Sequence, residues 1–317
     1  MKKILRSICS KSKFMKREYD KLTWYKSRVL LIIDDDKFAR KVYKKNCNKN
    51  LNLENPVTFD EKIWWLKLNN RNPLLKICSD KYRVREYISK CGYEENLVKL
   101  YGVYNDTSSI DFNKLPEKCI LKLNHTSGTN VIFNKNIEKL DLKDLTKRLN
   151  FLLKQDYFVK SREWNYKDME TKIIIEELLE TKSPYGLLDY KFMCFNGEPK
   201  LLFLDVGVAN EDGSHAQEYY RNIYDMKFEL LDVKETRENT PYIIEKPENF
   251  EKMIKMASDL SKPFPLVRVD LYNIDGKIYF GEMTFYHGGG CNNIAPEDFD
   301  RKMGSWIDLE YNNNYER

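Results

Sequence analysis

The stretch Leu266–Gly290, LVRVDLYNIDGKIYFGEMTFYHGGG, decides the predicted fold. In its first part, apolar residues such as Val267 and Val269 alternate with polar ones. Asn273–Gly276 supplies a turn, and Lys277–Phe280 follows it as a second run. Two such runs around a turn predict a β-hairpin.

The predicted hairpin carries a group of charged residues. Asp270 and Glu282 stand several residues either side of the turn, so they are able to converge on one face. Arg268 shares the face of Asp270, because strand side chains repeat every second residue. Mg²⁺ is usually held by one or two carboxylates plus phosphates, and arginine suits a phosphoryl group. The pattern favours a Mg²⁺–phosphate site. The alternative is an exposed hairpin with scattered charges.

Composition places the chain among globular proteins. It has 317 residues, enough for one large domain or two to three smaller ones, with 42% hydrophobic and 32% charged residues. A net charge of +5 does not require nucleic acid, and it suits an anionic small molecule, an anionic polysaccharide or a membrane surface. Seven cysteines without a Cys-x-x-Cys pair favour a reduced, cytoplasmic setting, and three histidines argue against a histidine-rich zinc site.

The N-terminal 28 residues are strongly basic, with ten lysines and arginines. They lack the apolar run of a signal peptide, and the apolar run 29–33 is too short to span a bilayer. One interpretation is a solvated helical arm. The other is attachment to an anionic membrane, at about 1 kcal/mol for each basic residue near the surface.

A phosphate-binding loop is predicted in the middle of the chain. Residues 115–124 and 131–133 read as strands, and the small residues of His125–Asn130 separate them. Such a loop offers backbone amides to an anion, and Lys122 stands just before it. The alternative is an ordinary hairpin with an exposed lysine.

The other segments interleave helices and strands. Thr58 caps a helix that runs to about Leu68, and Ser79 starts a second one. The aromatic segment 157–167 is either a surface helix edge or lid, or a sugar-stacking site with Trp164 on the ring and Arg162 or Lys167 on an acid group. Further predicted elements are a helix at 140–154, a buried strand at 172–177, a hairpin at 189–206 around Asn196-Gly197 and a helix at 247–260. Strands in hairpins favour an α+β fold with antiparallel sheets, and the absence of Gly-x-Gly-x-x-Gly and P-loop motifs argues against Rossmann and P-loop folds.

The order of these motifs resembles the ATP-grasp ligases. The motifs that carry the resemblance are Asp80-Lys81, Lys122 with its Ser-Gly loop, Ile175–Leu179, Asp189, Arg268–Asp270, Glu282–Thr284 and Gly288. Within the superfamily, the chain is similar to the branch related to the teichuronopeptide biosynthesis protein TupA, found in capsule and exopolysaccharide clusters. The signatures of that branch are Thr58–Ile63, Leu123–His125, Glu163–Tyr166, Asp189–Phe192 and Gly281–Phe285.

The resemblance implies a fold and cofactors. It implies two α+β subdomains that grip ATP between antiparallel sheets, preceded by a basic, mostly helical region. We expect this N-terminal region at 1–75, a lobe with the phosphate loop at 76–175, and a lobe with the metal site at 176–317. The cofactors implied are ATP and Mg²⁺. Most of the superfamily begins with an α/β domain that helps to bind the acid, and the helical N-terminus departs from that pattern.

The resemblance also implies residue roles. The ATP-binding residues would be Lys81 and Lys122 on the phosphates, Ser127 and Gly128 in the loop, Glu176, Glu177 and Leu179 at the adenine, and Asp189 and Lys191. The metal ligands would be Asp270, Glu282 and Thr284, the last standing where most ATP-grasp enzymes carry asparagine, which leaves a second Mg²⁺ open. The catalytic residues would be Arg268 beside the transferring phosphoryl group, the Gly288 amide at the tetrahedral intermediate, and His287, which is either a general base or a packing histidine.

The predicted activity is that of an ATP-dependent carboxylate–amine ligase of surface-polysaccharide biosynthesis. It would join a uronic acid or another sugar-linked carboxylate, free or nucleotide-linked, to an amine or amino acid. We expect no nucleic-acid partner, a cytoplasmic location, and peripheral contact with the membrane or the assembly machinery through the basic N-terminus. The rivals are a glycosyltransferase, for which Asp34–Asp36 is an Asp-x-Asp motif near the start of the chain, and a non-catalytic membrane-docked assembly protein.

Overall fold

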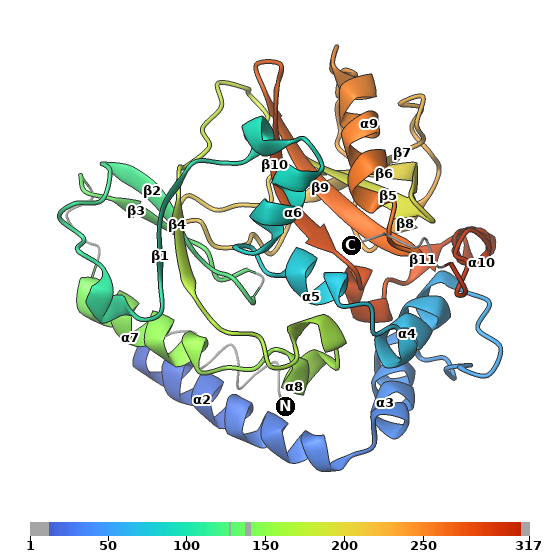
Figure 1. Ribbon diagram of the computed structural model, residues 1–317. Helices are drawn as coiled ribbons and strands as arrows, with labels where there is room; N and C mark the ends of the chain where they lie inside the picture. The colour runs from blue at the N-terminus through green and yellow to red at the C-terminus, as the bar shows by residue number, and fades with distance from the viewer. Residues whose placement is uncertain (1–12, 127, 137–140, 312–317) are drawn as a thin grey trace.

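The structure is a computed structural model that describes residues 13–126, 128–136 and 141–311. Two antiparallel sheets dominate these residues (Figure 1). The smaller sheet has the order β1-β4-β2-β3, and its strands are β1 (Leu100–Tyr104), β2 (Lys118–Leu123), β3 (Val131–Asn134) and β4 (Ile173–Glu176). The larger sheet has the order β10-β9-β5-β6-β7, and its strands are β5 (Asp189–Phe195), β6 (Glu198–Val206), β7 (Tyr220–Tyr224), β9 (Leu266–Ile274) and β10 (Lys277–Thr284). The prediction of an α+β fold with antiparallel sheets is confirmed.

The predicted hairpin is β9–β10, and its register contains a bulge. Ile274 pairs with Lys277 around a turn in which Asp275 and Gly276 both have positive φ. Regular alternation would place Glu282 on the same face as Phe280. The register instead shifts between Phe280 and Glu282, so that Glu282 lies opposite Asp270. The bulge therefore turns Glu282 onto the charged face of the sheet.

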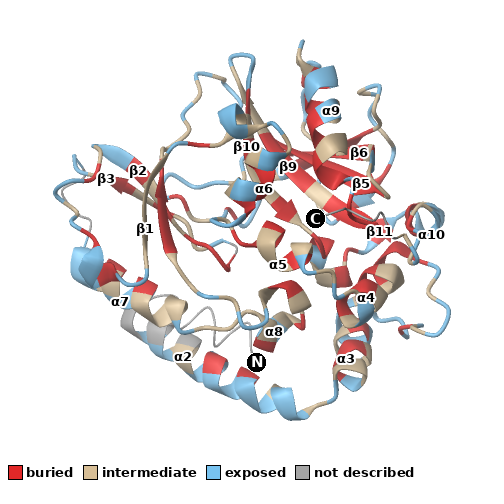
Figure 2. Cartoon of the chain, viewed as in Figure 1, coloured by how far each residue is buried: buried red, intermediate tan, exposed pale blue. Residues whose placement is uncertain are grey.

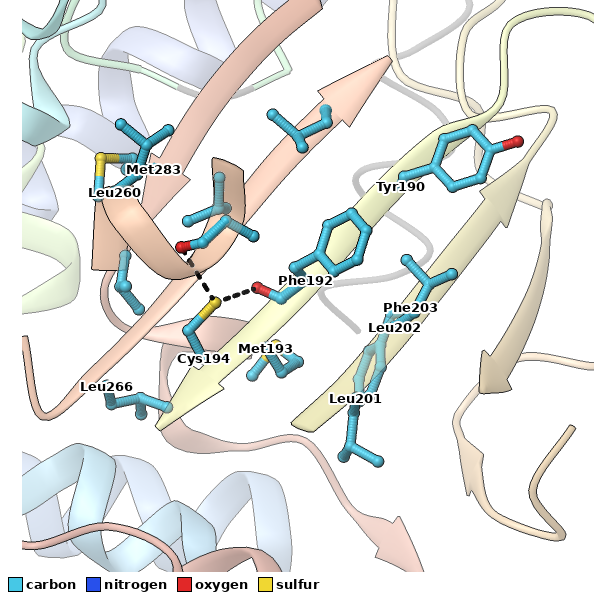
Figure 3. Close-up of a cluster of buried hydrophobic side chains, with 14 of the residues drawn as sticks. Tyr190, Phe192, Met193, Cys194, Leu201, Leu202, Phe203, Leu260, Leu266 and Met283 are labelled. Carbon is cyan, nitrogen blue, oxygen red and sulfur yellow. Dashed lines mark hydrogen bonds between the residues drawn. The ribbon is translucent and has the colours of Figure 1, made fainter. Parts of the chain in front are cut away.

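The other face of the larger sheet forms the main core. Helix α9 (Phe250–Ser261) contacts β5, β6 and β9 there. Figure 3 shows part of this core, in which the Cys194 thiol lies between the carbonyl oxygens of Phe192 and Ala257, at 3.5 and 3.8 Å. Because these side chains are almost fully buried, the β5–β9 scaffold that carries the charged face is held rigidly.

The smaller sheet has its own core. Helix α7 (Leu142–Leu153) contributes Leu145 and Leu149, which pack on Leu121, Ile173 and Ile175. The remaining elements are the short helices α5 (Leu74–Ser79), α6 (Val84–Lys90), α8 (Phe158–Ser161) and α10 (Glu297–Ser305), the turns η2 (Glu94–Asn96), η3 (Thr107–Ser109), η4 (Trp164–Tyr166) and η5 (His287–Gly290), and the two-stranded sheet β8 (Lys234–Glu235) with β11 (Ile294–Ala295).

The helix that was expected to start at Ser79 starts later. Ser79 ends α5, and the Asp80 carboxylate accepts hydrogen bonds from the amides of Tyr82 and Arg83. This turn delays α6 to Val84 and leaves Lys81 in a non-helical position between the two sheets.

The N-terminal region is helical, as expected. It contains α2 (Lys13–Val29), η1 (Leu30–Ile32), α3 (Asp35–Cys47) and α4 (Phe59–Asn69), and α4 begins with the predicted capping box at Thr58 and Glu61. Arg162 ties this region to the rest of the protein, because it binds the Leu30 carbonyl at 2.6 Å and the Asp35 carboxylate at 2.7 Å. Arg162 is only 1% exposed, so the interpretation that it binds a sugar acid is wrong.

Candidate active site

A ring of charged side chains covers one face of the larger sheet. Strand pairing places Lys191 beside Asp270, Asp189 beside Asp205, and Glu282 beside Asp270. Arg268 donates to both oxygens of Asp270, at 2.7 and 2.6 Å, and lies 3.3 Å from Glu282. The structure thus brings four predicted site residues, Arg268, Asp270, Glu282 and Lys191, into direct contact.

The ring continues through residues that the sequence did not indicate. Arg221 on β7 binds both oxygens of Asp205, at 2.5 and 2.6 Å, and also binds Glu235 on β8. Glu235 forms a hydrogen bond with His287, and His287 forms another with Arg268, which closes the ring. Together with Lys81, the ring consists of four cations that form ion pairs with five carboxylates. The cations are Lys81, Lys191, Arg221 and Arg268, and the carboxylates are Asp189, Asp205, Glu235, Asp270 and Glu282.

The ring shifts the pKa values of its carboxylates in different directions. Burial raises the pKa of Asp189 to about 6, although Lys191 acts against the rise. Burial would also raise the pKa of Glu282, but Lys81, Arg268 and Lys191 outweigh it and hold that pKa at about 2. Glu282 is therefore a permanent anion at neutral pH, as a Mg²⁺ ligand has to be.

Both nitrogens of the His287 imidazole form hydrogen bonds with members of the charged ring. An arginine only donates, so Nδ1 of His287 accepts from Arg268 at 2.9 Å. Nε2 then carries the proton and donates to the Glu235 carboxylate, 3.1 Å away. Burial lowers the pKa of His287, and Glu235 opposes that shift only in part. This neutral tautomer has no free lone pair for a substrate amine, so the geometry favours a positioning role for His287 over that of a general base.

The predicted phosphate and adenine residues meet on the smaller sheet. Lys122 and Arg85 both bind the Glu176 carboxylate, at 2.9 and 3.1 Å. Glu177 follows directly after β4, where its amide donates to the Lys99 carbonyl at 2.9 Å, and Leu179 lies in the irregular segment beyond it. One pocket is lined by Lys122, Glu176, Lys81 and Gly281, which places residues of both sheets around the same space.

Lys81 connects the two sheets. Its Nζ donates to the Thr126 carbonyl in the predicted phosphate loop at 2.9 Å and lies 3.2 Å from the Glu282 carboxylate. Gly128 in that loop is exposed with a φ of +69°. The predicted loop residue Ser127 lies outside the described residues.

Helix α4 fixes the glycine loop η5. Trp64 Nε1 donates to the Gly290 carbonyl at 2.9 Å, and Lys67 Nζ donates to the Gly289 carbonyl at 3.0 Å. Gly288 has a φ of +54°, and a side chain there would collide with Asn292. The loop thus needs glycine, and its backbone is held in one conformation beside Arg268.

The carboxylate set fits Mg²⁺ bound together with phosphates. Asp270 and Glu282 are adjacent, and the Thr284 hydroxyl donates to Glu282 at 3.3 Å. Within residues 13–126, 128–136 and 141–311, no group of three or more His, Cys, Asp or Glu residues has the geometry to hold a metal ion. Two carboxylates are nevertheless enough for Mg²⁺ when the nucleotide supplies the remaining oxygens.

Two antiparallel sheets, one with Lys122 on the strand before a glycine-containing loop and the other with a carboxylate–arginine face, are the arrangement expected of an ATP-grasp protein. The chain belongs to the TupA-like ATPgrasp family, whose sequence model matches residues 61–308. The match confirms the family that the sequence motifs predicted. The predicted activity, that of an ATP-grasp carbon–nitrogen ligase, is consistent with this family. No curated protein matches the chain.

Several solved structures are similar to the chain. They include an L-amino acid ligase from Bacillus licheniformis (14% identity, 67% of this chain, 44% of that chain, TM-score 0.42) and a D-alanine–D-alanine ligase from Bacillus anthracis complexed with ATP (17%, 66%, 55%, 0.38). A third is the D-cycloserine synthetase DcsG (13%, 74%, 70%, 0.42). The chain spans about half of the length of the first two.

Proposed function

We propose that the protein is an ATP-dependent ligase that joins a carboxylate to an amine through an acyl phosphate. A carboxylate oxygen attacks the γ-phosphorus of ATP and ADP leaves. The amine nitrogen then attacks the acyl carbon, phosphate leaves, and the amine proton passes to solvent or phosphate. The observation that carries this proposal is the contact of Arg268, Asp270, Glu282 and Lys81 where the two sheets meet.

The protein residues position the reactants and neutralise charge, which is most of the catalysis in phosphoryl transfer. Lys81 and Lys122 line the pocket for the phosphates, and Arg268 faces the transferring phosphoryl group. Glu176 and the backbone of Glu177 to Leu179 lie at the adenine end, with Asp189 and Lys191 on the ribose and phosphate side. Mg²⁺ on Asp270 and Glu282, with Thr284 beside them, would neutralise the phosphate charge.

Binding of the nucleotide requires the ring to open. Each cation that would contact phosphate is paired with a carboxylate in the structure: Lys122 with Glu176, Lys81 and Arg268 with Glu282. ATP with Mg²⁺ brings both an anion and a cation, so it is able to exchange these pairs without leaving a buried charge unpaired. We expect ATP to bind weakly without Mg²⁺ for this reason.

We propose a uronic acid or another sugar-linked carboxylate as the acid, and an amine or amino acid as the nucleophile, in the biosynthesis of a capsular or other surface polysaccharide. The support for this substrate class is the family.

We also propose that α2 docks on an anionic membrane surface. Leu22, Tyr25 and Val29 are each more than half exposed, and Ile32 of η1 is 86% exposed (Figure 2). Lys26 and Arg28 stand in the last turn of α2. Apolar side chains flanked by cations suit the interface of an anionic bilayer. Among the described residues, no helix is long and apolar enough to cross a membrane.

A glycosyltransferase is the less supported alternative. In its Asp-x-Asp motif, Asp34 caps α3 by accepting from the amides of Asp36 and Lys37, and Asp36 binds Arg40 at 2.8 Å. These carboxylates therefore stabilise the N-terminal part of α3. The assembly-protein alternative predicts membrane binding without turnover, which the following experiment separates.

The test is release of ADP and phosphate from ATP and Mg²⁺ with uronic acids, free and nucleotide-linked, crossed with amino acids and amines. We expect release that needs both an acid and an amine, that disappears in Asp270→Ala and Lys122→Met, and that persists in the matched controls Asp275→Asn and Lys118→Met. Asp275 and Lys118 are exposed residues on the same hairpin and the same strand. Absence of ATP binding by calorimetry would refute the proposed function.

A further inference from the structure

A cavity of about 150 Å³ lies beside the start of the predicted phosphate loop. Its walls come from the start of the loop, the end of α7, the segment before α8 and the turn η4. The lining residues used below are His125, Gln155, Asp156, Tyr157, Tyr166 and Asp168. A cavity of about this volume holds one six-membered ring.

The cavity continues the row of pockets along the active site. Glu176 and Lys122 share the adenine-side pocket with Lys81, and Lys81 shares the next pocket with Glu282 and Tyr166. Tyr166 is also a wall of the cavity. Tyr166 therefore separates the cavity from the pocket that Lys81 and Glu282 line.

His125 presents a buried acceptor to the cavity. The Asn124 amide nitrogen donates to Asp80 at 2.9 Å and to the Glu170 carbonyl at 2.8 Å, so the Asn124 oxygen is the atom that faces His125 Nδ1, at 3.3 Å. An amide oxygen only accepts, so this contact is a hydrogen bond in the tautomer in which Nδ1 carries the proton. Burial lowers the pKa of His125 to about 4, which keeps the ring neutral at pH 7.

Nε2 of His125 is consequently a lone-pair acceptor in a residue that is 1% exposed, and it has no hydrogen bond in the structure. The carbonyl oxygens of Leu152 and Gln155 lie near the ring and act to raise its pKa, and in this tautomer they offer Nε2 no donor. A buried acceptor without a donor is unfavourable. The cavity therefore suits a ligand that brings a hydrogen-bond donor.

The other walls favour the same kind of ligand. Asp156 and Asp168 add carboxylate acceptors, and they are close enough for Asp168 to raise the pKa of Asp156, after the larger effect of burial. Tyr157 and Tyr166 pack edge to face with ring centroids 5.0 Å apart and offer flat apolar surface. Aromatic surface combined with several acceptors matches a ring that is apolar on its faces and carries hydroxyl groups at its edge.

We propose that this cavity binds the pyranose ring of one of the two substrates, with its hydroxyl groups on His125, Asp156 and Asp168 and its reacting substituent directed past Tyr166. The inference rests on the proposed ligase function and names the subsite that function lacks. The two carboxylates exclude a carboxylate from the cavity itself, so the carboxyl group of a uronic acid would lie outside it, toward Lys81 and Arg268. An amino sugar would offer the same ring chemistry as the amine substrate.

The test measures binding without ATP, so it does not depend on turnover. The full chain is titrated by ligand-observed NMR with glucuronate, galacturonate, glucosamine and glucose, at concentrations suited to a Kd of about 1 mM. We expect at least one sugar to bind, about tenfold more weakly in Asp168→Asn, which replaces a charged acceptor by a neutral amide, and about fivefold more weakly in His125→Phe, which removes the Nε2 lone pair. Preference for a uronate or for glucosamine identifies which substrate uses the cavity.

The controls separate the cavity from the rest of the site. Glu170→Gln changes an exposed carboxylate two residues from Asp168, and we expect it to bind as the wild type does. Asp168 is also exposed, so its asparagine variant tests the cavity even where His125→Phe unfolds. Binding of no sugar, or equal binding by the Asp168 variant and the wild type, would overturn the inference.

The inference and the proposed function fail in distinguishable ways. Sugar binding that depends on Asp168, without any binding of ATP by calorimetry, would support the cavity and refute the ligase. Turnover whose KM for the sugar substrate is unchanged by Asp168→Asn would support the ligase and refute the cavity. If both hold, Asp168→Asn raises that KM about tenfold and leaves kcat nearly unchanged.

Discussion

Replacement of Lys191 by methionine should destabilise the protein strongly, because three buried carboxylates share the Lys191 ammonium. Nζ lies 3.5 Å from Asp270 and 3.6 Å from Asp205, and it also contacts Asp189. All four residues are less than a tenth exposed. Removal of one partner from a buried ion pair costs about 3–5 kcal/mol, because the remaining charge is left uncompensated.

Thermal unfolding measures this effect without knowledge of the substrates. For a protein of this size, that loss corresponds to a fall of about 5–8 °C in Tm. Lys118→Met is the matched control, since Lys118 pairs with Glu180 at 2.7 Å on the surface, where such pairs are worth less than about 1 kcal/mol. We expect its Tm to change by no more than a few degrees.

The same variant tests the metal assignment. Without Lys191, the carboxylates should bind Mg²⁺ more tightly, so Mg²⁺ should raise the Tm of Lys191→Met more than that of the wild type. A variant as stable as the wild type would refute the reasoning about the ring. A destabilised variant that Mg²⁺ does not stabilise would refute Asp270 as a metal ligand.

Three further predictions follow from other contacts. His287→Gln can still accept from Arg268, so it should keep most of the turnover, whereas His287→Phe should lose about tenfold or more; equal losses in both would favour a general base. Burial raises the pKa of Asp60 to about 6, so the folded state binds a proton more readily than the unfolded chain, and the free energy of unfolding should fall as pH rises from about 4 to 6. Asp60→Asn should flatten this pH dependence in urea unfolding, and an unchanged pH dependence would contradict the prediction. Glutamate at Leu22 and Val29 should abolish sedimentation with phosphatidylserine vesicles, while retained binding would exclude α2 as the docking surface.

Local sequence signals were enough to predict the elements that carry the site. The turns at Asn196-Gly197 and Asp275-Gly276 adopt the positive φ angles that glycine and asparagine or aspartate tolerate, and both hairpins form. The bulge at Gly281 was not predicted. A Cβ at Gly281 would lie 3.0 Å from the Asp270 carbonyl, so glycine fits there, but one glycine in a strand does not specify a register shift.

The part of the ring formed by Asp205, Arg221 and Glu235 was also not predicted from the sequence. Asp205 ends a run of apolar residues, and a carboxylate on a fully buried strand is the one signal that was available. Arg221 and Glu235 lie 16 and 30 residues further on and meet Asp205 and His287 only through the packing of β7 and β8. Such contacts depend on tertiary structure, and neither periodicity nor spacing encodes them.

The helical N-terminal region contributes to the site through α4, which holds the glycine loop in place. Residues more than 200 positions earlier in the chain bind the glycine loop and the residue after it: Trp64 and Lys67 donate to carbonyl groups of the loop, and Asp60 accepts from the backbone and side chain of Asn292. Asn292 in turn donates to the His287 carbonyl at 3.1 Å. Because His287 accepts from Arg268, a shift of α4 would be transmitted to the arginine that we propose for the phosphoryl group. We therefore assign α4 to the support of the reaction centre, although the predicted region 1–75 groups it with the basic arm.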